Sequence, residues 1–194
     1  MSDTKNNCYG NKEKRRFFLG DEIDKSSFAF LYWEILNLIR EDDEKEAKEK
    51  DFVRKPIHLH ICSPGGYYSQ SMGLVSLLQN SKTPIYTYNC GTASSGALKI
   101  FLAGHKRYCY QYSEFMYHQL WISTSGTVQD LTESHENNKK LQEKLEQYVA
   151  ARTKMSPELL KEIREKKQNY HMDAEMALKL GVVDEIITEG EKDE

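Results

Sequence analysis

The spacing of apolar positions divides the N-terminal part of the chain into a strand and a helix. Residues 16–20 form a short apolar run that ends at a glycine, which predicts a strand. Apolar residues in 28–39 recur every three or four positions, and Asp24 before them is a helix-cap signal, so this segment predicts an amphipathic helix. The charged run 41–51 predicts a solvated helix end and loop.

Two strand–turn–helix units follow in the middle of the chain. Residues 56–63 and 84–91 are apolar, strand-like runs, and each leads through a glycine-containing turn into a helix-like segment. The helix-like segments are residues 67–80 and 94–105. This order predicts an α/β fold with a parallel sheet, in which ligands bind at the carboxyl ends of the strands. Both turns are therefore expected at one edge of the sheet.

The last third of the chain alternates between sheet-like and helical patterns. Residues 106–110 and 114–119 are short apolar pieces that predict further strands, and a long helix is expected over about 130–152. The first half of that helix is nearly all polar, which favours a projecting helix over a core helix. The remaining predicted elements are a helix that begins at Ser156 and Pro157, a short helix over 173–181 and a strand over 182–187.

Composition narrows the class of protein. A chain of 194 residues with 39% hydrophobic residues suits one domain, and a net charge of −3 gives no reason to expect nucleic acid as a partner. No apolar run approaches the roughly 20 residues of a membrane span, and the N-terminus lacks a signal-peptide core. We expect a cytoplasmic protein with reduced cysteines and no membrane partner. His58 and His60 share one strand face without an evident third ligand, so neither a metal nor another cofactor is expected.

The turn 91–96 raises the question of whether a serine there is a nucleophile or a helix cap. Ser95 would lie at a helix start, where the N–H of Gly96 could donate to an oxyanion, and His118 is the natural candidate for a base. The segment departs from the G-x-S-x-G pattern because Ala93 stands at the first glycine position. Spacing alone leaves both interpretations open, and Lys99, one helical turn after Ser95, offers a minor serine–lysine alternative.

Five segments in order resemble motifs of the proteolytic subunit of the Clp protease family, ClpP. They are Ile61–Gly66 (ICSPGG), Gly91–Ala97 (GTASSGA), Leu102–Arg107 (LAGHKR), Met116–Leu120 (MYHQL) and Gly181–Asp184 (GVVD). The resemblance runs from about Arg16 to Ile187, nearly the whole chain. It implies that Ser95 is the nucleophile, that His118 is its general base, and that the backbone N–H groups of Gly66 and Gly96 form the oxyanion hole.

The third member of the implied triad departs from the family pattern. Where the family has an aspartate, counting back from Gly181 lands on Asn169. An asparagine can accept a hydrogen bond from the imidazole, but it carries no charge to stabilise an imidazolium. Asp173 or Glu165 takes this place if the local register shifts.

The resemblance also implies the fold and the assembly. It implies a crotonase/ClpP-like ββα spiral over 16–188 with a projecting handle helix at about 119–152. The polar composition of residues 1–15 predicts a poorly ordered segment, and residues 189–194 form a charged tail. Polypeptide substrates and a homo-oligomer of stacked seven-membered rings follow from the resemblance. An AAA+ unfoldase or a paralogous subunit is a further partner, although the few residues before Arg16 argue against the unfoldase.

Three functions are compatible with this sequence. The first is a self-compartmentalised serine endopeptidase, of a divergent type such as those of phages or prophages. The second is a ring subunit that is catalytically weak or inactive and acts as a scaffold, which Asn169 suggests. The third is an acyl-CoA enzyme of the crotonase type, which the serine–histidine pair disfavours. The sequence favours the endopeptidase.

Overall fold

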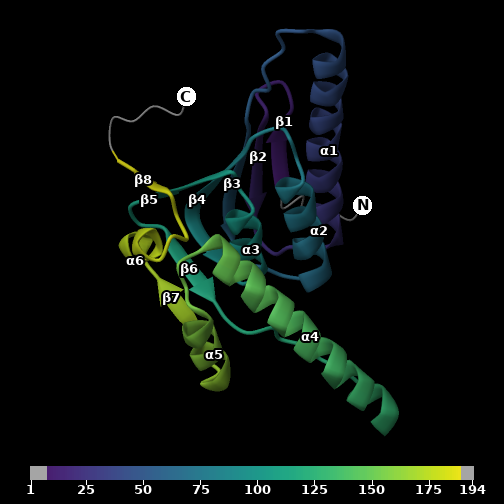
Figure 1. Cartoon of the computed structure of the whole chain (residues 1–194), viewed down its shortest axis with the longest axis vertical. Coiled ribbons are helices and arrows are strands. Elements are labelled where there is room, and N and C mark those ends of the chain that lie inside the picture. Colours follow the sequence, from purple (N-terminus) through teal and green to yellow (C-terminus); the bar gives the residue numbers. More distant parts are fainter. Residues whose placement is uncertain (1–7, 189–194) are drawn as a thin grey trace, which may run out of the picture.

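The computed structural model describes residues 8–188, which form six helices and one eight-stranded, mostly parallel sheet (Figure 1). The predicted α/β class is confirmed. The strands are β1 (Cys8–Asn11), β2 (Arg16–Gly20), β3 (Ile57–Ser63), β4 (Ile85–Ser94), β5 (Lys106–Tyr110), β6 (Glu114–Tyr117), β7 (Tyr170–Met172) and β8 (Glu185–Ile187). The helices are α1 (Lys25–Lys48), α2 (Tyr68–Gln79), α3 (Gly96–Leu102), α4 (Val128–Arg152), α5 (Pro157–Glu165) and α6 (Ala174–Lys179).

Strand β4 is the branch point of the sheet. One side of it pairs with β3, whereas the other side pairs first with β5 and then, at residues 92–94, with β6. All three pairings are parallel, and β7 joins β6 in antiparallel register. The sequence predicted that β4 ends at Gly91, but the pairing with β6 extends it to Ser94. The carboxyl ends of β4 and β6 therefore lie side by side.

Helix α3 lies in the centre of the core. All seven of its residues are buried, and it contacts α2, β3, β4, β6 and α4. Its apolar side chains join inward-facing residues of the sheet and of α1 and α2 in a single cluster; examples are Leu98, Phe101, Leu59, Ile61, Leu74 and Leu31. The start of α3 is thus held on all sides, which fixes the position of the turn that precedes it.

The N-terminal segment is more ordered than the sequence predicted. Cys8–Asn11 form β1, which pairs with β2 in antiparallel register, and Cys8 is buried in the core. Backbone pairing and the burial of Cys8 outweigh the polar composition of this stretch. Residues 1–7 and the charged tail 189–194 lie outside the described part of the chain.

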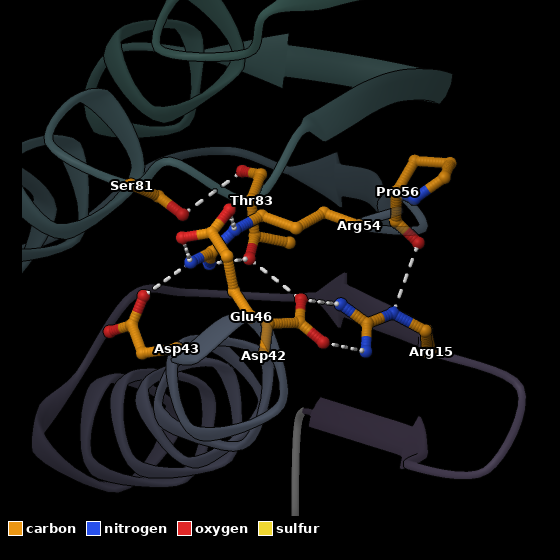
Figure 2. Close-up of polar contacts among 8 residues, drawn as sticks. All are labelled: Arg15, Asp42, Asp43, Glu46, Arg54, Pro56, Ser81 and Thr83. Atoms are coloured by element: carbon orange, nitrogen blue, oxygen red, sulfur yellow. Dashed lines mark hydrogen bonds and ion pairs between the residues drawn. The ribbon is translucent and has the colours of Figure 1, made fainter. Parts of the chain in front are cut away.

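The charged run after α1's apolar face is also not uniformly solvated. The helix continues to Lys48, and the carboxylate of Asp42 on it is 2% exposed. Arg15 donates two hydrogen bonds to that carboxylate (3.1 and 2.7 Å), and the Thr83 hydroxyl donates a third (2.7 Å) (Figure 2). The guanidinium of Arg54 donates to the Thr83 oxygen at 3.0 Å. This network joins α1, the β1–β2 turn and the segments before β3 and β4.

Aromatic rings and the two alternating histidines form a ladder across β3, β4 and β5. The rings of His60 and Tyr88 stack with centroids 4.6 Å apart, and Tyr88 stacks on Tyr108 at 5.0 Å. His58 Nδ1 lies 2.9 Å from the Tyr88 hydroxyl. The two histidines thus have packing roles in the sheet, and no group of three potential metal ligands occurs within residues 8–188.

Helix α4 extends away from the sheet (Figure 1). Its buried residues, Gln142, Leu145 and Val149, all lie in its second half, as the sequence predicted for a projecting helix. In the loop before it and in its first turns, Trp121, Val128 and Leu131 are exposed. No helix between residues 8 and 188 is long and apolar enough to cross a membrane.

Candidate active site

Ser95 occupies a strained turn between the end of β4 and the start of α3. Its backbone angles are φ 52° and ψ −118°, a region that residues with a side chain rarely adopt. The Ser95 N–H donates to the Met116 carbonyl at 2.9 Å, which anchors the turn to β6. Such strain costs about 1–3 kcal/mol and occurs most often at functional sites. The side chain of Ser95 makes no cap bond to α3, which disfavours the helix-cap interpretation.

Parallel pairing of β4 with β6 brings Ser95 to His118. Ser94 is in register with Met116, so the residues just beyond the two strands emerge at the same edge of the sheet. The distance from Ser95 Oγ to His118 Nε2 is 2.8 Å, which is a hydrogen bond. The neighbouring Ser94 Oγ instead contacts Thr92 Oγ1 at 3.1 Å. Of the two adjacent serines, only Ser95 is therefore paired with the histidine.

The surroundings of His118 favour its neutral form. Burial lowers the pKa of His118, and the positive charge of Lys99 lowers it further, while a backbone group of Gln119 acts in the opposite direction. A neutral imidazole has one nitrogen free to accept a proton. At neutral pH, His118 is thus prepared to take the proton of the Ser95 hydroxyl.

Two backbone N–H groups flank the serine. Gly96 is the first residue of α3, so its N–H has no acceptor in a preceding helical turn. Gly66 forms a parallel β-bridge with Ile23. The two hydrogen bonds of this bridge join the Ile23 N–H to the Gly65 carbonyl and the Tyr67 N–H to the Ile23 carbonyl, so the N–H of Gly66 itself points away from Ile23. The Gly66 nitrogen lies 3.4 Å from where a Cβ on Gly96 would be, so the two N–H groups are neighbours.

Glycine is required at position 65 for this approach. Gly65 has φ 102°, and a Cβ there would lie 2.7 Å from the Ser94 oxygen and 2.8 Å from both the Gly96 nitrogen and the Ser95 Cβ. No side chain fits between the two turns. The close approach of the turns is what places the Gly66 and Gly96 N–H groups beside the serine, where they could donate to an oxyanion.

A cavity of about 730 Å³ opens beside the serine. Ser95, Gly66, Gly96 and His118 line it together with Tyr67 before α2 and with side chains of α2, α4 and the loop before α4; these include Met72, Trp121, Leu141 and Leu145. A cavity of this volume falls within the usual range of ligand-binding sites in proteins. No pattern in the sequence indicates that the loop with Trp121 lines the cavity.

Asn169, which the family resemblance implies as the third triad member, lies beside His118 in the backbone, but its side chain is not hydrogen-bonded to the imidazole. Tyr117 of β6 is in register with Tyr170 of β7, so one further step places His118 opposite Asn169. Asn169 is exposed, and within residues 8–188 no hydrogen bond joins it to His118. The alternatives are engaged elsewhere: Asp173 caps α6 through the Met176 N–H (2.8 Å), and Glu165 lies 3.8 Å from Lys161.

A serine that is hydrogen-bonded to a histidine and lies beside two backbone N–H groups able to donate to an oxyanion is the arrangement found in acyl-transfer hydrolases. Comparison with known proteins agrees with that class. The model of the Clp protease family matches residues 5–190, and the chain belongs to this family. It is also similar to the ATP-dependent Clp protease proteolytic subunit 1 of Rhodopirellula baltica, with 27% identity over 187 residues, which cover 91% of this chain and 78% of the relative. Membership supports a function of the serine-protease type.

Proposed function

We propose that this chain is a self-compartmentalised serine endopeptidase in which Ser95 is the nucleophile and His118 the general base. The observation that carries the proposal is the 2.8 Å contact between Ser95 Oγ and His118 Nε2 at a strained turn. Family membership supports peptide bonds as the substrate.

The geometry supports an acyl-enzyme mechanism. Ser95 Oγ attacks the peptide carbonyl carbon while His118 Nε2 takes the hydroxyl proton, and the N–H groups of Gly66 and Gly96 donate to the oxyanion. Collapse of the intermediate breaks the C–N bond, and His118 gives its proton to the departing amine. A water molecule then attacks the ester, with His118 again as base, and releases Ser95. Asn169 is the proposed orienting residue, because the β6–β7 register continues to a position at which it lies opposite His118.

A ring assembly would protect cellular proteins from this site. The projecting first half of α4, with exposed Val128 and Leu131, and the exposed Trp121 before it support contacts with further copies of the chain. We propose a homo-oligomer of stacked, seven-membered rings in the cytoplasm, with polypeptides as substrates.

Hydrolysis of a short internally quenched peptide tests the proposal. Ser95→Ala and His118→Ala should each lower kcat/KM by at least ~1000-fold, since the two residues act as one unit. Ser94→Ala is the matched control and should stay within about threefold of the unmodified protein. If Ser95→Ala retained the cleavage rate, another nucleophile would be at work and the proposal would be wrong. A folded but inactive unmodified protein would leave the scaffold role instead.

A further inference from the structure

A lysine lies buried in the wall of the active-site cavity. Lys99 is on α3, one turn after Ser95, and it lines the same cavity although the residue is only 5% exposed. Burial of an ammonium group without a partner is costly, and it lowers the pKa of Lys99 to about 7. The charge of Lys99 also lowers the pKa of His118, which places the two groups within electrostatic range of each other.

The ammonium group of Lys99 has no anionic partner among residues 8–188. No hydrogen bond or ion pair from Lys99 Nζ to another side chain is present there, and its contact is the ring face of Tyr117, with Nζ 5.3 Å from the centroid. Glu22 lines the cavity but is exposed and forms no ion pair with Lys99 within the described chain. Glu146 on α4 is bonded to Arg164 at 3.0 Å. The positive charge of Lys99 is therefore available to an anionic group of a ligand that enters the cavity.

A role for Lys99 as the general base does not fit the hydrogen bonds. Ser95 Oγ is already bonded to His118 Nε2, and the Lys99 amine makes no bond to it. Since α3 side chains point back toward the N-terminus of the helix, the Lys99 stem runs along the wall of the cavity near the serine. The ring of Tyr117 offsets part of the cost of burying the charged form, which is the form that binds anions and not the form that accepts a proton.

We propose that Lys99 binds a carboxylate of the substrate and thereby selects peptides with an acidic residue on the acyl side of the scissile bond. This inference rests on the proposed peptidase function, because the serine defines which residue lies next to the lysine. The apolar side chains of Met72, Leu141 and Leu145 line the same cavity. A glutamate side chain would contribute its methylene groups to these walls and its carboxylate to the unpaired ammonium, so each buried charge would receive a partner.

The carboxylate that binds Lys99 could come from an acidic side chain or from the free C-terminus of a peptide, and the choice of substrates distinguishes these two groups. Four peptides of otherwise identical sequence are compared: three are amidated at the C-terminus and carry Glu, Gln or Leu on the acyl side of the scissile bond. The fourth carries Leu there and a free C-terminus one residue beyond. The proteins are the unmodified chain, Lys99→Met, which keeps the length of the side chain without its charge, and Lys161→Met, which removes an exposed lysine of α5 as the matched control.

The expected result is a kcat/KM for the Glu peptide that exceeds that of the Gln peptide by at least about tenfold. Lys99→Met should abolish or invert this ratio, whereas Lys161→Met should leave the ratio within about threefold of that of the unmodified protein. Equal or better cleavage of Gln and Leu peptides by the unmodified protein would overturn the inference and leave the peptidase function intact. A Lys99-dependent preference for the free C-terminus would assign the lysine to that carboxylate and overturn the side-chain source. Absence of cleavage together with no fluorophosphonate adduct on Ser95 would overturn the peptidase function itself.

Discussion

Removal of the Asp42 carboxylate should destabilise the fold strongly although it lies in a charged, solvated-looking stretch of sequence. Asp42→Ala takes away three hydrogen bonds at once, two from Arg15 and one from Thr83. The Arg15 side chain is 15% exposed, so its guanidinium would remain mostly buried without a counter-charge (Figure 2). Arg54 would keep its bonds to Thr83, Asp43 and Glu46.

The magnitude follows from breaking a buried ion pair. Loss of one partner of such a pair costs about 3–5 kcal/mol, and partial hydration of Arg15 favours the lower end, about 3 kcal/mol. For a chain of this length each kcal/mol lowers Tm by about 2–4 °C, so the expected drop is about 6–12 °C. The adjacent Asp43 is 52% exposed and bonds only to Arg54, so Asp43→Ala should cost less than about 1 kcal/mol.

Urea unfolding followed by circular dichroism measures both variants at one protein concentration, because assembly makes apparent stability depend on concentration. The reasoning is refuted if Asp42→Ala lies within 1 kcal/mol of Asp43→Ala. Such a result would mean that the network in Figure 2 contributes no more than a surface ion pair. A loss of secondary structure in Asp42→Ala before urea is added would be the extreme form of the expected effect.

Three further predictions concern the site. Because the pKa of His118 is lowered in the folded protein, cleavage of the Leu peptide should persist below pH 6.5 and should fall only as the pH drops through that lowered pKa. Lys99→Met removes a positive charge near His118 and should move this acidic limb of the pH–rate profile to higher pH. An unmoved limb would argue against the charge coupling between the two residues. Gly65→Ala should lower kcat at least ~100-fold, because a Cβ would separate the turn from Ser95; near-normal kcat would show that the close approach is dispensable. Asn169→Asp should raise kcat at least ~10-fold over the unmodified protein if this position orients His118, and no gain would assign the orienting role elsewhere.

Local pattern was sufficient for most elements of the fold, because apolar periodicity and cap residues act over a few positions. The cap at Asp24, with its reciprocal bond to Ser27, and the helix start at Ser156 were visible as sequence signals. Contacts between residues far apart in the sequence were not visible in this way. The extension of β4 to Ser94 depends on β6, and the burial of Asp42 depends on Arg15 and Thr83, which lie 27 and 41 positions away.

The candidate site likewise has features that the sequence predicts and features that only the structure reveals. Ser95 and His118 were candidates from residue type and from the family resemblance, but only the β4–β6 pairing explains why they meet. The backbone angles of Ser95 carry no mark in sequence, since the turn has alanine where a G-x-S-x-G elbow has glycine. Lys99 appeared as a minor base candidate, whereas its lack of an anionic partner among residues 8–188 could be recognised only from its surroundings.

Whether Ser95 is an activated nucleophile is tested most directly by a fluorophosphonate probe and intact-mass measurement. The account predicts one adduct per chain in the unmodified protein and in Ser94→Ala, and none in Ser95→Ala, because Ser95 alone of the two serines is bonded to His118. An unlabelled unmodified protein, or an adduct that survives Ser95→Ala, would contradict the account.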